Sequence, residues 1–121
     1  MRVYISKKGV DSLRVLKFIV NGQILEKDPN CDFSGLVPGT FGYIQAEFSF
    51  SPEWNNVAKA AGFYSAMGKE YPAKVLEDGK TCMIPVEALA KKAFKIHIVG
   101  RTPNSYITTN KVEVLQDGGA K

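Results

Sequence analysis

The chain has little of what would build a metal centre or cross a membrane. Its 121 residues include two cysteines, Cys31 and Cys82, and one histidine, His97. A closed tetrahedral zinc site takes its ligands mainly from Cys and His, and these residues are too few to complete one within a single chain. No apolar run approaches the roughly eighteen residues of a membrane-spanning helix. We therefore predict no metal, no cofactor and no membrane partner.

The N-terminus lacks a hydrophobic stretch of signal-peptide length before Lys7 and Lys8. We expect the chain to be made in, and to stay in, a cytoplasm unless another machine carries it out. In that reducing setting both thiols should be unpaired. Cys82, which lies between Thr81 and Met83, is expected to be a small buried apolar side chain rather than a reactive group.

Neither sign of charge dominates the sequence. Sixteen Lys and Arg against twelve Asp and Glu leave a net charge of +4, and the last third of the chain is the most basic. No run reaches the length of like charges that marks a polybasic arm. Solvated lysines explain this distribution better than a phosphate-binding patch, so nucleic acid is not the expected partner.

Residue types that carry catalysis are scarce. His97 stands between Ile96 and Ile98 on the lysine-bearing face of an alternating segment, so we expect a solvated side chain rather than a general base. The glycines at 35–42 lack the lysine and following helix of a phosphate loop. The sequence therefore predicts no catalytic, cofactor-binding or metal-ligating residue, and no enzyme.

Acidic pairs occur at Asp28 and Asp32 and at Glu77 and Asp78. Each pair lies in a segment rich in turn-forming residues, and turn chemistry alone explains Asp there. We therefore do not interpret either pair as a metal-binding or glycosidase carboxylate site.

Alternating apolar and polar residues predict strands along most of the chain. The most regular one is Tyr43–Phe50, which places Ile44, Ala46, Phe48 and Phe50 on one face. The other expected strands are Arg2–Ser6, Tyr71–Leu76, Thr81–Ile84, Phe94–Arg101 and Tyr106–Leu115. Residues 57–67 fit either a strand or one face of a helix, and the residues alone leave this open.

Two turn signals predict hairpins. Asn21-Gly22 separates the apolar runs 13–20 and 23–25, and this dipeptide favours a type I′ turn in which both central residues have positive φ. A buried helix over residues 13–20 is the alternative. Asp78-Gly79 likewise predicts a hairpin between the strands that flank it.

The remaining segments are a loop, a helix and a tail. Residues 26–42 form a loop that is long for a compact domain. Apolar residues at positions 86, 89, 90 and 93 predict two turns of helix over Pro85–Ala93. The tail, residues 116–121, has nothing to pack against and is expected to fray.

Trp54 follows a strand whose apolar face carries Phe48 and Phe50, so we interpret it as a core side chain rather than a ligand contact. The five tyrosines remain candidates for a stacking platform for sugars or bases. They are Tyr4, Tyr43, Tyr64, Tyr71 and Tyr106.

Seven to nine short strands with one short helix indicate a mainly β protein with an antiparallel β-sandwich fold. We divide the chain into an N-terminal hairpin and extended arm at 1–43, a sandwich core at 44–115, and a flexible tail at 116–121. The long loop within the arm is interpreted as a segment that reaches a neighbouring subunit.

A series of packing residues runs in order through 44–115: Ala46–Trp54, Ala61–Phe63, Val75–Gly79, Thr81–Leu89, Phe94–Gly100 and Ile107–Asn110. This series resembles the small Ig-like domains of tailed-phage virion proteins. The resemblance favours a strand at 57–67. It implies an Ig-like core filled by Phe48, Phe50 and Trp54 from one sheet and by Phe63, Cys82, Ile84, Ile96 and Ile98 from the other, with Pro85 leading into a helix that covers an open end.

The same resemblance implies a structural role in a bacteriophage virion, as a capsid decoration or head-fibre component. Its expected partners are other virion proteins, with many copies or a homo-oligomer in the assembly. The expected location is the virion, after assembly in the host cytoplasm. A tail or baseplate component is one alternative. A soluble module that binds polysaccharide or nucleic acid is the other, suggested by the tyrosines and the basic last third.

Overall fold

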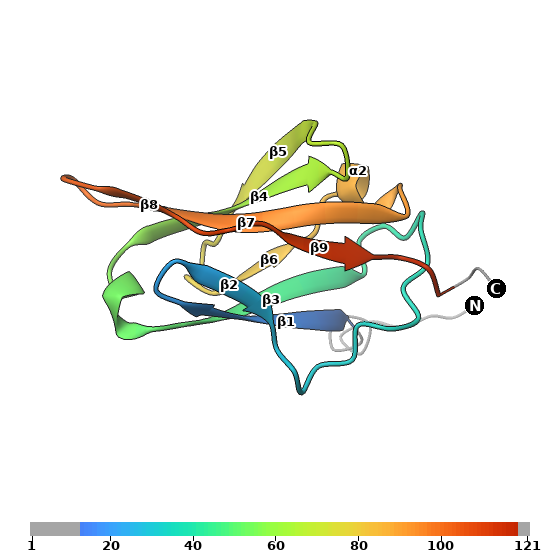
Figure 1. Ribbon diagram of the computed structural model, residues 1–121, viewed down its shortest axis with the longest axis horizontal. Coiled ribbons are helices and arrows are strands. Elements are labelled where there is room, and N and C mark those ends of the chain that lie inside the picture. The colour runs from blue at the N-terminus through green and yellow to red at the C-terminus, as the bar shows by residue number, and fades with distance from the viewer. Residues whose placement is uncertain (1–12, 119–121) are drawn as a thin grey trace.

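A computed structural model describes residues 13–118, and Figure 1 shows two β-sheets packed face to face. One sheet has the order β2-β1-β3-β6, and the other has the order β5-β4-β7-β8 with β9 also paired to β7. Over residues 13–118 this arrangement confirms the predicted mainly β sandwich with one short helix. The predicted strand at residues 2–6 lies outside the described residues.

The elements follow the chain in this order: β1 (Arg14–Asn21), β2 (Ile24–Lys27), β3 (Ile44–Phe50), the 3₁₀ turn η1 (Pro52–Trp54), β4 (Ala58–Ser65), β5 (Glu70–Val75), β6 (Thr81–Met83), helix α2 (Val86–Leu89), β7 (Ala93–Arg101), β8 (Tyr106–Thr108) and β9 (Val112–Leu115). The segment at 57–67, left open by its residues, is therefore a strand.

The sandwich includes most of the region assigned to an arm. β1 pairs with β2 on one side and with β3 on the other, and it buries Leu16, Phe18 and Val20. Because these alternating apolar residues need a core, β1 joins the sheet, and the sandwich begins at Arg14 rather than at residue 44. β1 and β3 are parallel, an exception to the predicted antiparallel pairing, because the chain returns after β2 to the end where β1 begins.

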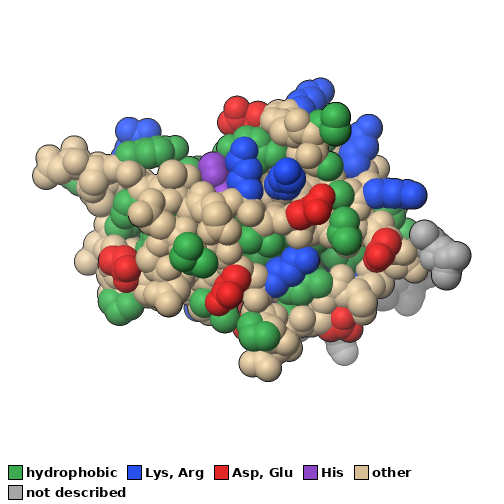
Figure 2. Space-filling view, viewed as in Figure 1, with side chains coloured by type: hydrophobic (Ala, Val, Ile, Leu, Met, Phe, Trp, Pro, Cys, Tyr) green, Lys and Arg blue, Asp and Glu red, His purple; other side chains and the backbone are tan. Residues whose placement is uncertain are grey.

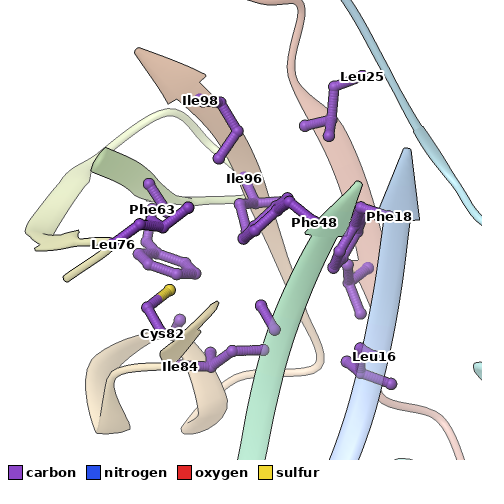
Figure 3. Close-up of a cluster of buried hydrophobic side chains, with 14 of the residues drawn as sticks. Leu16, Phe18, Leu25, Phe48, Phe63, Leu76, Cys82, Ile84, Ile96 and Ile98 are labelled. Carbon is purple, nitrogen blue, oxygen red and sulfur yellow. The ribbon is translucent and has the colours of Figure 1, made fainter. Parts of the chain in front are cut away.

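The core lies between the two sheets (Figure 3). Phe18 of β1 and Phe48 of β3 are stacked, with ring centroids 5.2 Å apart, and Phe48 lies next to Ile96 of β7. Cys82 lies on β6 opposite Ala46 of β3. The expectation that Cys82 and Ile84 fill the core from the sheet opposite Phe48 is therefore wrong, because β6 adds to the edge of β3.

Trp54 is fully buried, as the sequence predicts. Its indole Nε1 donates a hydrogen bond to the carbonyl oxygen of Gly22 at 2.8 Å, which connects η1 to the turn between β1 and β2. The ring also lies against Gly100 of β7, where an added Cβ would come within 2.6 Å of it. Position 100 must therefore stay without a side chain for the indole to fit between the sheets.

The first predicted hairpin is confirmed, but its turn is displaced by one residue. Asn21 pairs with Ile24, so Gly22 and Gln23 are the central residues. Gly22 has φ +62° and Gln23 is not among the described residues with positive φ. These signs match a type II′ turn, not the expected type I′ turn.

The second predicted hairpin is wrong. β5 pairs with β4 and β6 pairs with β3, so the turn at Asp78-Gly79 crosses between the sheets. The Asp78 carboxylate accepts hydrogen bonds from the Thr81 hydroxyl and from the backbone N–H groups of Lys80 and Thr81. These bonds lower the pKa of Asp78 to about 2. The Asp-Gly dipeptide predicted the turn correctly, but it did not indicate which strands the two flanking strands pair with.

The predictions of a two-turn helix and of a fraying tail are both wrong, and the helix end and the tail contact each other. Helix α2 ends at Leu89, after a single turn, and Gln116 is 1% exposed. The Gln116 side-chain amide donates to the carbonyl oxygens of Leu89 and Lys91, and its backbone N–H donates to that of Lys92. Gln116 therefore provides hydrogen-bond donors for carbonyl groups at the end of the helix and just after it. The described part of the tail, up to Gly118, is held against the sandwich and does not fray.

The last predicted strand is broken between β8 and β9. There the Asn110 side chain accepts from the N–H of Leu25 at 2.7 Å and donates to the carbonyl oxygen of Leu25 at 3.0 Å. Asn110 thus pairs with the outer edge of β2 as a strand residue would. The chain leaves β7 to make this connection between the two sheets.

We predict that Asn110→Ala lowers the free energy of unfolding by about 1–3 kcal/mol, because both polar groups of Leu25 lose a partner. Urea denaturation followed by circular dichroism measures the change. The control is Asn104→Ala, since the Asn104 side chain makes no hydrogen bond within residues 13–118. Equal effects of the two substitutions would contradict the role of Asn110.

Candidate functional site

The outer face of the five-stranded sheet carries a cluster of polar side chains around His97. The Tyr64 hydroxyl lies 2.9 Å from Nε2 of His97, and the Thr108 hydroxyl lies 3.5 Å from Nδ1. Lys111 places its ammonium 3.9 Å from the centre of the Tyr64 ring. We call these four residues the His97 cluster.

His97 is half-buried rather than freely solvated, which corrects the sequence-based expectation. Its ring lies over Gly62 of the neighbouring strand, where an added Cβ would be 2.6 Å from Nε2. A solvated position was expected because Lys95 shares the face of His97. The absence of a side chain at Gly62 leaves a hollow that the imidazole fills.

Burial is the main cause that lowers the pKa of His97, and the nearby Lys111 ammonium lowers it further, while Glu70 acts in the opposite direction. The pKa of Tyr64 is raised, chiefly by burial and then by Glu70. At neutral pH the cluster therefore pairs a neutral imidazole with a neutral phenol. Among the described residues no carboxylate hydrogen-bonds to the imidazole, so the cluster lacks the group that would orient a general base.

The tyrosines do not form a shared stacking platform in the part of the chain that the structure describes. Tyr43 belongs to the start of the four-stranded sheet, and Tyr71 packs against the core. The ring of Tyr64 is covered by Lys111, and that of Tyr106 by the Arg101 guanidinium at 5.3 Å. Tyr4 lies outside the described residues.

Two of the grooves on the surface of residues 13–118 bear on a binding function. The first, of about 350 Å³, lies between β5, β4 and β7 and is lined by Ala58, Lys59, Ala60, Val75, Val99, Gly100, Arg101 and Tyr106. The second, of about 530 Å³, lies between the β4–β5 turn and the segment that leads into β7. We call the second one the lysine groove; it is lined by Ser65, Ala66, Met67, Lys69, Tyr71, Lys91, Lys92 and Ala93.

Several exposed apolar side chains belong to segments at one end of the sandwich, the right-hand end in Figure 1, where β1, β3 and β7 begin and β4 and β9 end. The most exposed are Met67 at 95% and Phe41 at 77%. We call this surface the apolar end; it consists of Val37, Phe41, Tyr43, Met67, Val86 and Leu115. Exposed apolar side chains that share one end of a fold are available for contact with a partner.

The loop that carries Phe41 is fastened to its own sandwich. The Arg14 guanidinium donates to the carbonyl oxygens of Asp32 and Ser34, and the N–H of Gly39 donates to the carbonyl oxygen of Leu89 at 2.7 Å. Leu36 is buried in the core. These bonds hold the loop against the sandwich, while the Phe41 side chain stays exposed. The predicted contact of the loop with a neighbouring subunit stays a prediction.

Of the residues of the apolar end, sequence reasoning named Tyr43, as a stacking candidate, and it placed Val37 and Phe41 in the loop expected to reach a neighbouring subunit. The available signal was Phe41, a large aromatic residue in a loop between Gly39 and Gly42 with no alternating neighbours to share a core. Met67 and Leu115 gave no signal, since their exposure depends on where β4 and β9 end.

Both cysteines are unpaired, as predicted, and Cys82 is buried. Burial raises the pKa of the Cys82 thiol to about 12, so this thiol remains protonated and unreactive at neutral pH. Within residues 13–118 no three Cys, His, Asp or Glu side chains come together as metal ligands. Over the same residues no helix has the length and apolar character needed to span a bilayer.

Comparison with known proteins gives no relative: no family model, curated protein or solved structure matches the chain.

We predict that Lys111→Gln raises the pKa of His97 towards its ordinary value of about 6.5, because the substitution removes a neighbouring positive charge. NMR titration of the imidazole measures it directly, since the chain has a single histidine. Lys91→Gln is the control and should leave the titration unchanged.

The lowered pKa also sets a pH dependence of stability. The unfolded chain binds a proton at His97 more readily than the folded one, so stability should fall as pH drops from about 6.5 through the folded-state pKa. A His97 that titrates at or above its ordinary value would contradict both expectations.

Proposed function

We propose that the protein is a structural component of a bacteriophage virion that docks onto other virion proteins through its apolar end. The observation that carries this proposal is the concentration of exposed apolar side chains at one end of a sandwich whose remaining large aromatic residues mostly fill the core. Burying such a surface against a partner removes apolar area from water, which is the main favourable term in protein association.

The choice of a virion as the assembly rests on the resemblance of the packing series to Ig-like virion domains. In the fold this series supplies structural positions: Phe48 and Trp54 fill the core, and Gly100 makes room for the indole. The His97 cluster offers a neutral imidazole and a neutral phenol beside the Lys111 ammonium, with no carboxylate among the described residues to orient a catalytic base. A role in docking fits these features better than a role in catalysis.

Within the virion we propose a capsid accessory, either a decoration or a head-fibre component, present in many copies. A tail or baseplate position is the alternative and would use the same apolar end. Immunogold labelling of intact particles separates the two, because the label would decorate heads in the first case and tails in the second.

The alternative function is a soluble module that binds polysaccharide or nucleic acid. The number of tyrosines suggested this function, but their positions in the fold give it less support. The Lys111 ammonium lies over the ring of Tyr64 and the Arg101 guanidinium over that of Tyr106, so a cation already occupies one face of each ring where a sugar or a base would stack.

We predict that the wild-type chain co-purifies with density-gradient-purified particles of the phage that encodes it, and that Phe41→Ser lowers its copy number there by about tenfold, a factor equivalent to about 1.4 kcal/mol. Loss of an aromatic anchor from the contact is the reason. Quantitative mass spectrometry of the particles measures the copy number.

Ile24→Ser is the matched control. Ile24 is also an exposed apolar side chain, but it lies at the β1–β2 turn, away from the apolar end. Both variants should melt like the wild type. Absence of the wild-type chain from purified particles would refute the virion role, and equal incorporation of both variants would remove the apolar end from the docking surface.

A further inference from the structure

We propose that the lysine groove binds an acidic segment of a partner protein, in which an apolar side chain enters the groove and neighbouring carboxylates meet the lysines. The proposal rests on the docking role suggested above and names the chemistry of the partner. Figure 2 shows Lys and Arg side chains, with some Asp and Glu between them, at the end of the molecule to which the groove belongs.

Among the described residues, all charged side chains that line the groove are positive. Lys69 stands on the wall made by the β4–β5 turn, and Lys91 and Lys92 stand on the wall that leads into β7. No Asp or Glu is among the residues that line the groove in the described part of the chain. A segment lying between the walls therefore meets lysine side chains on both sides, which favours carboxylates in the segment.

The interior of the groove suits an apolar side chain. Ala66 and Ala93 leave space between the walls, and Met67, which is 95% exposed, can cover an inserted side chain with its flexible thioether. The volume of about 530 Å³ falls within the range of small binding sites.

Both walls are held in place before any partner binds. In the β4–β5 turn the Ser65 hydroxyl oxygen accepts hydrogen bonds from the N–H groups of Met67 and Lys69. On the opposite wall Gln116 bonds to the carbonyl oxygens of Lys91 and Lys92. Because the two walls are already ordered, less conformational entropy is lost when a ligand binds, so the groove is preorganised.

Nucleic acid would also be attracted by three lysines, but the groove lacks what it needs for base contacts. Tyr71 is the one aromatic residue among those that line the groove in the described part of the chain, and it is partly buried against the core. The lysines supply charge without a stacking surface, and this favours an acidic peptide over a single-stranded nucleic acid.

The test is a selection of binders from a random-sequence peptide library displayed on a heterologous carrier, using the full-length chain as bait. We expect enriched peptides to carry Asp or Glu next to Leu, Ile, Met or Phe. Enrichment of peptides without an acidic excess, or no enrichment at all, would overturn the proposal.

The enriched peptides are then measured against variants by fluorescence anisotropy. Lys91→Glu combined with Lys92→Glu should weaken binding by at least about tenfold, a factor equivalent to about 1.4 kcal/mol. Added salt should weaken the wild-type complex as well. Ala66→Trp should weaken binding without any change of charge, because the indole would occupy the groove.

The control is Lys17→Glu combined with Lys80→Glu, which makes the same change of net charge at exposed lysines outside the groove. Binding that falls equally in this control would overturn the proposal in favour of a general charge effect. Tighter binding of a labelled oligo(dT) than of the selected peptides, lost in the Lys91 and Lys92 variant, would reassign the groove to nucleic acid.

Sedimentation velocity of the protein without peptide tests whether the groove binds a second copy of the chain. Self-association that disappears in the Lys91 and Lys92 variant would assign the groove to a second copy and overturn the proposal. Because these measurements use purified protein, their failure is distinct from absence of the chain from particles, which tests the virion role alone.

Discussion

The burial of the apolar face of β3 against that of β7 is the constraint on which the rest of the structure depends. Phe48 and Ile96 meet across the core because strand alternation sends every second side chain inward. Once these two strands face each other, β1 and β6 join one side, and β4, β8 and β9 join the other. The indole of Trp54 then fills the space left by Gly100, close to the β1–β2 turn.

Two side-chain amides complete the sandwich where backbone pairing stops. Asn110 pairs with the edge of β2, which connects the sheets on one side, and Gln116 bonds to the carbonyl groups of Leu89, at the end of α2, and of Lys91. Both residues use a polar side chain to satisfy backbone groups that would otherwise lack a partner, and such groups are costly when buried. Gln116 also fixes one wall of the lysine groove, so core closure and the proposed binding surface share a residue.

The surface divides into regions with different properties. The outer face of the five-stranded sheet holds the His97 cluster, in which each aromatic or basic group already has a partner within the chain. The apolar end and the lysine groove instead expose side chains such as Phe41 and Met67. Surfaces that still have apolar area to bury are those that gain most from association, and the proposed docking role is placed there for this reason.

The sequence by itself determined the β-sandwich class, most strand positions, the buried Trp54 and the burial of Cys82, because alternation and turn residues are local signals. It also located the turns at Gly22 and Asp78. The tertiary structure alone decided which strands pair, so it separated β5 from β6 and made β1 parallel to β3. It also decided the burial of Gln116 and the exposure of Phe41 and Met67, since these depend on contacts between residues far apart in the chain, which no local pattern encodes.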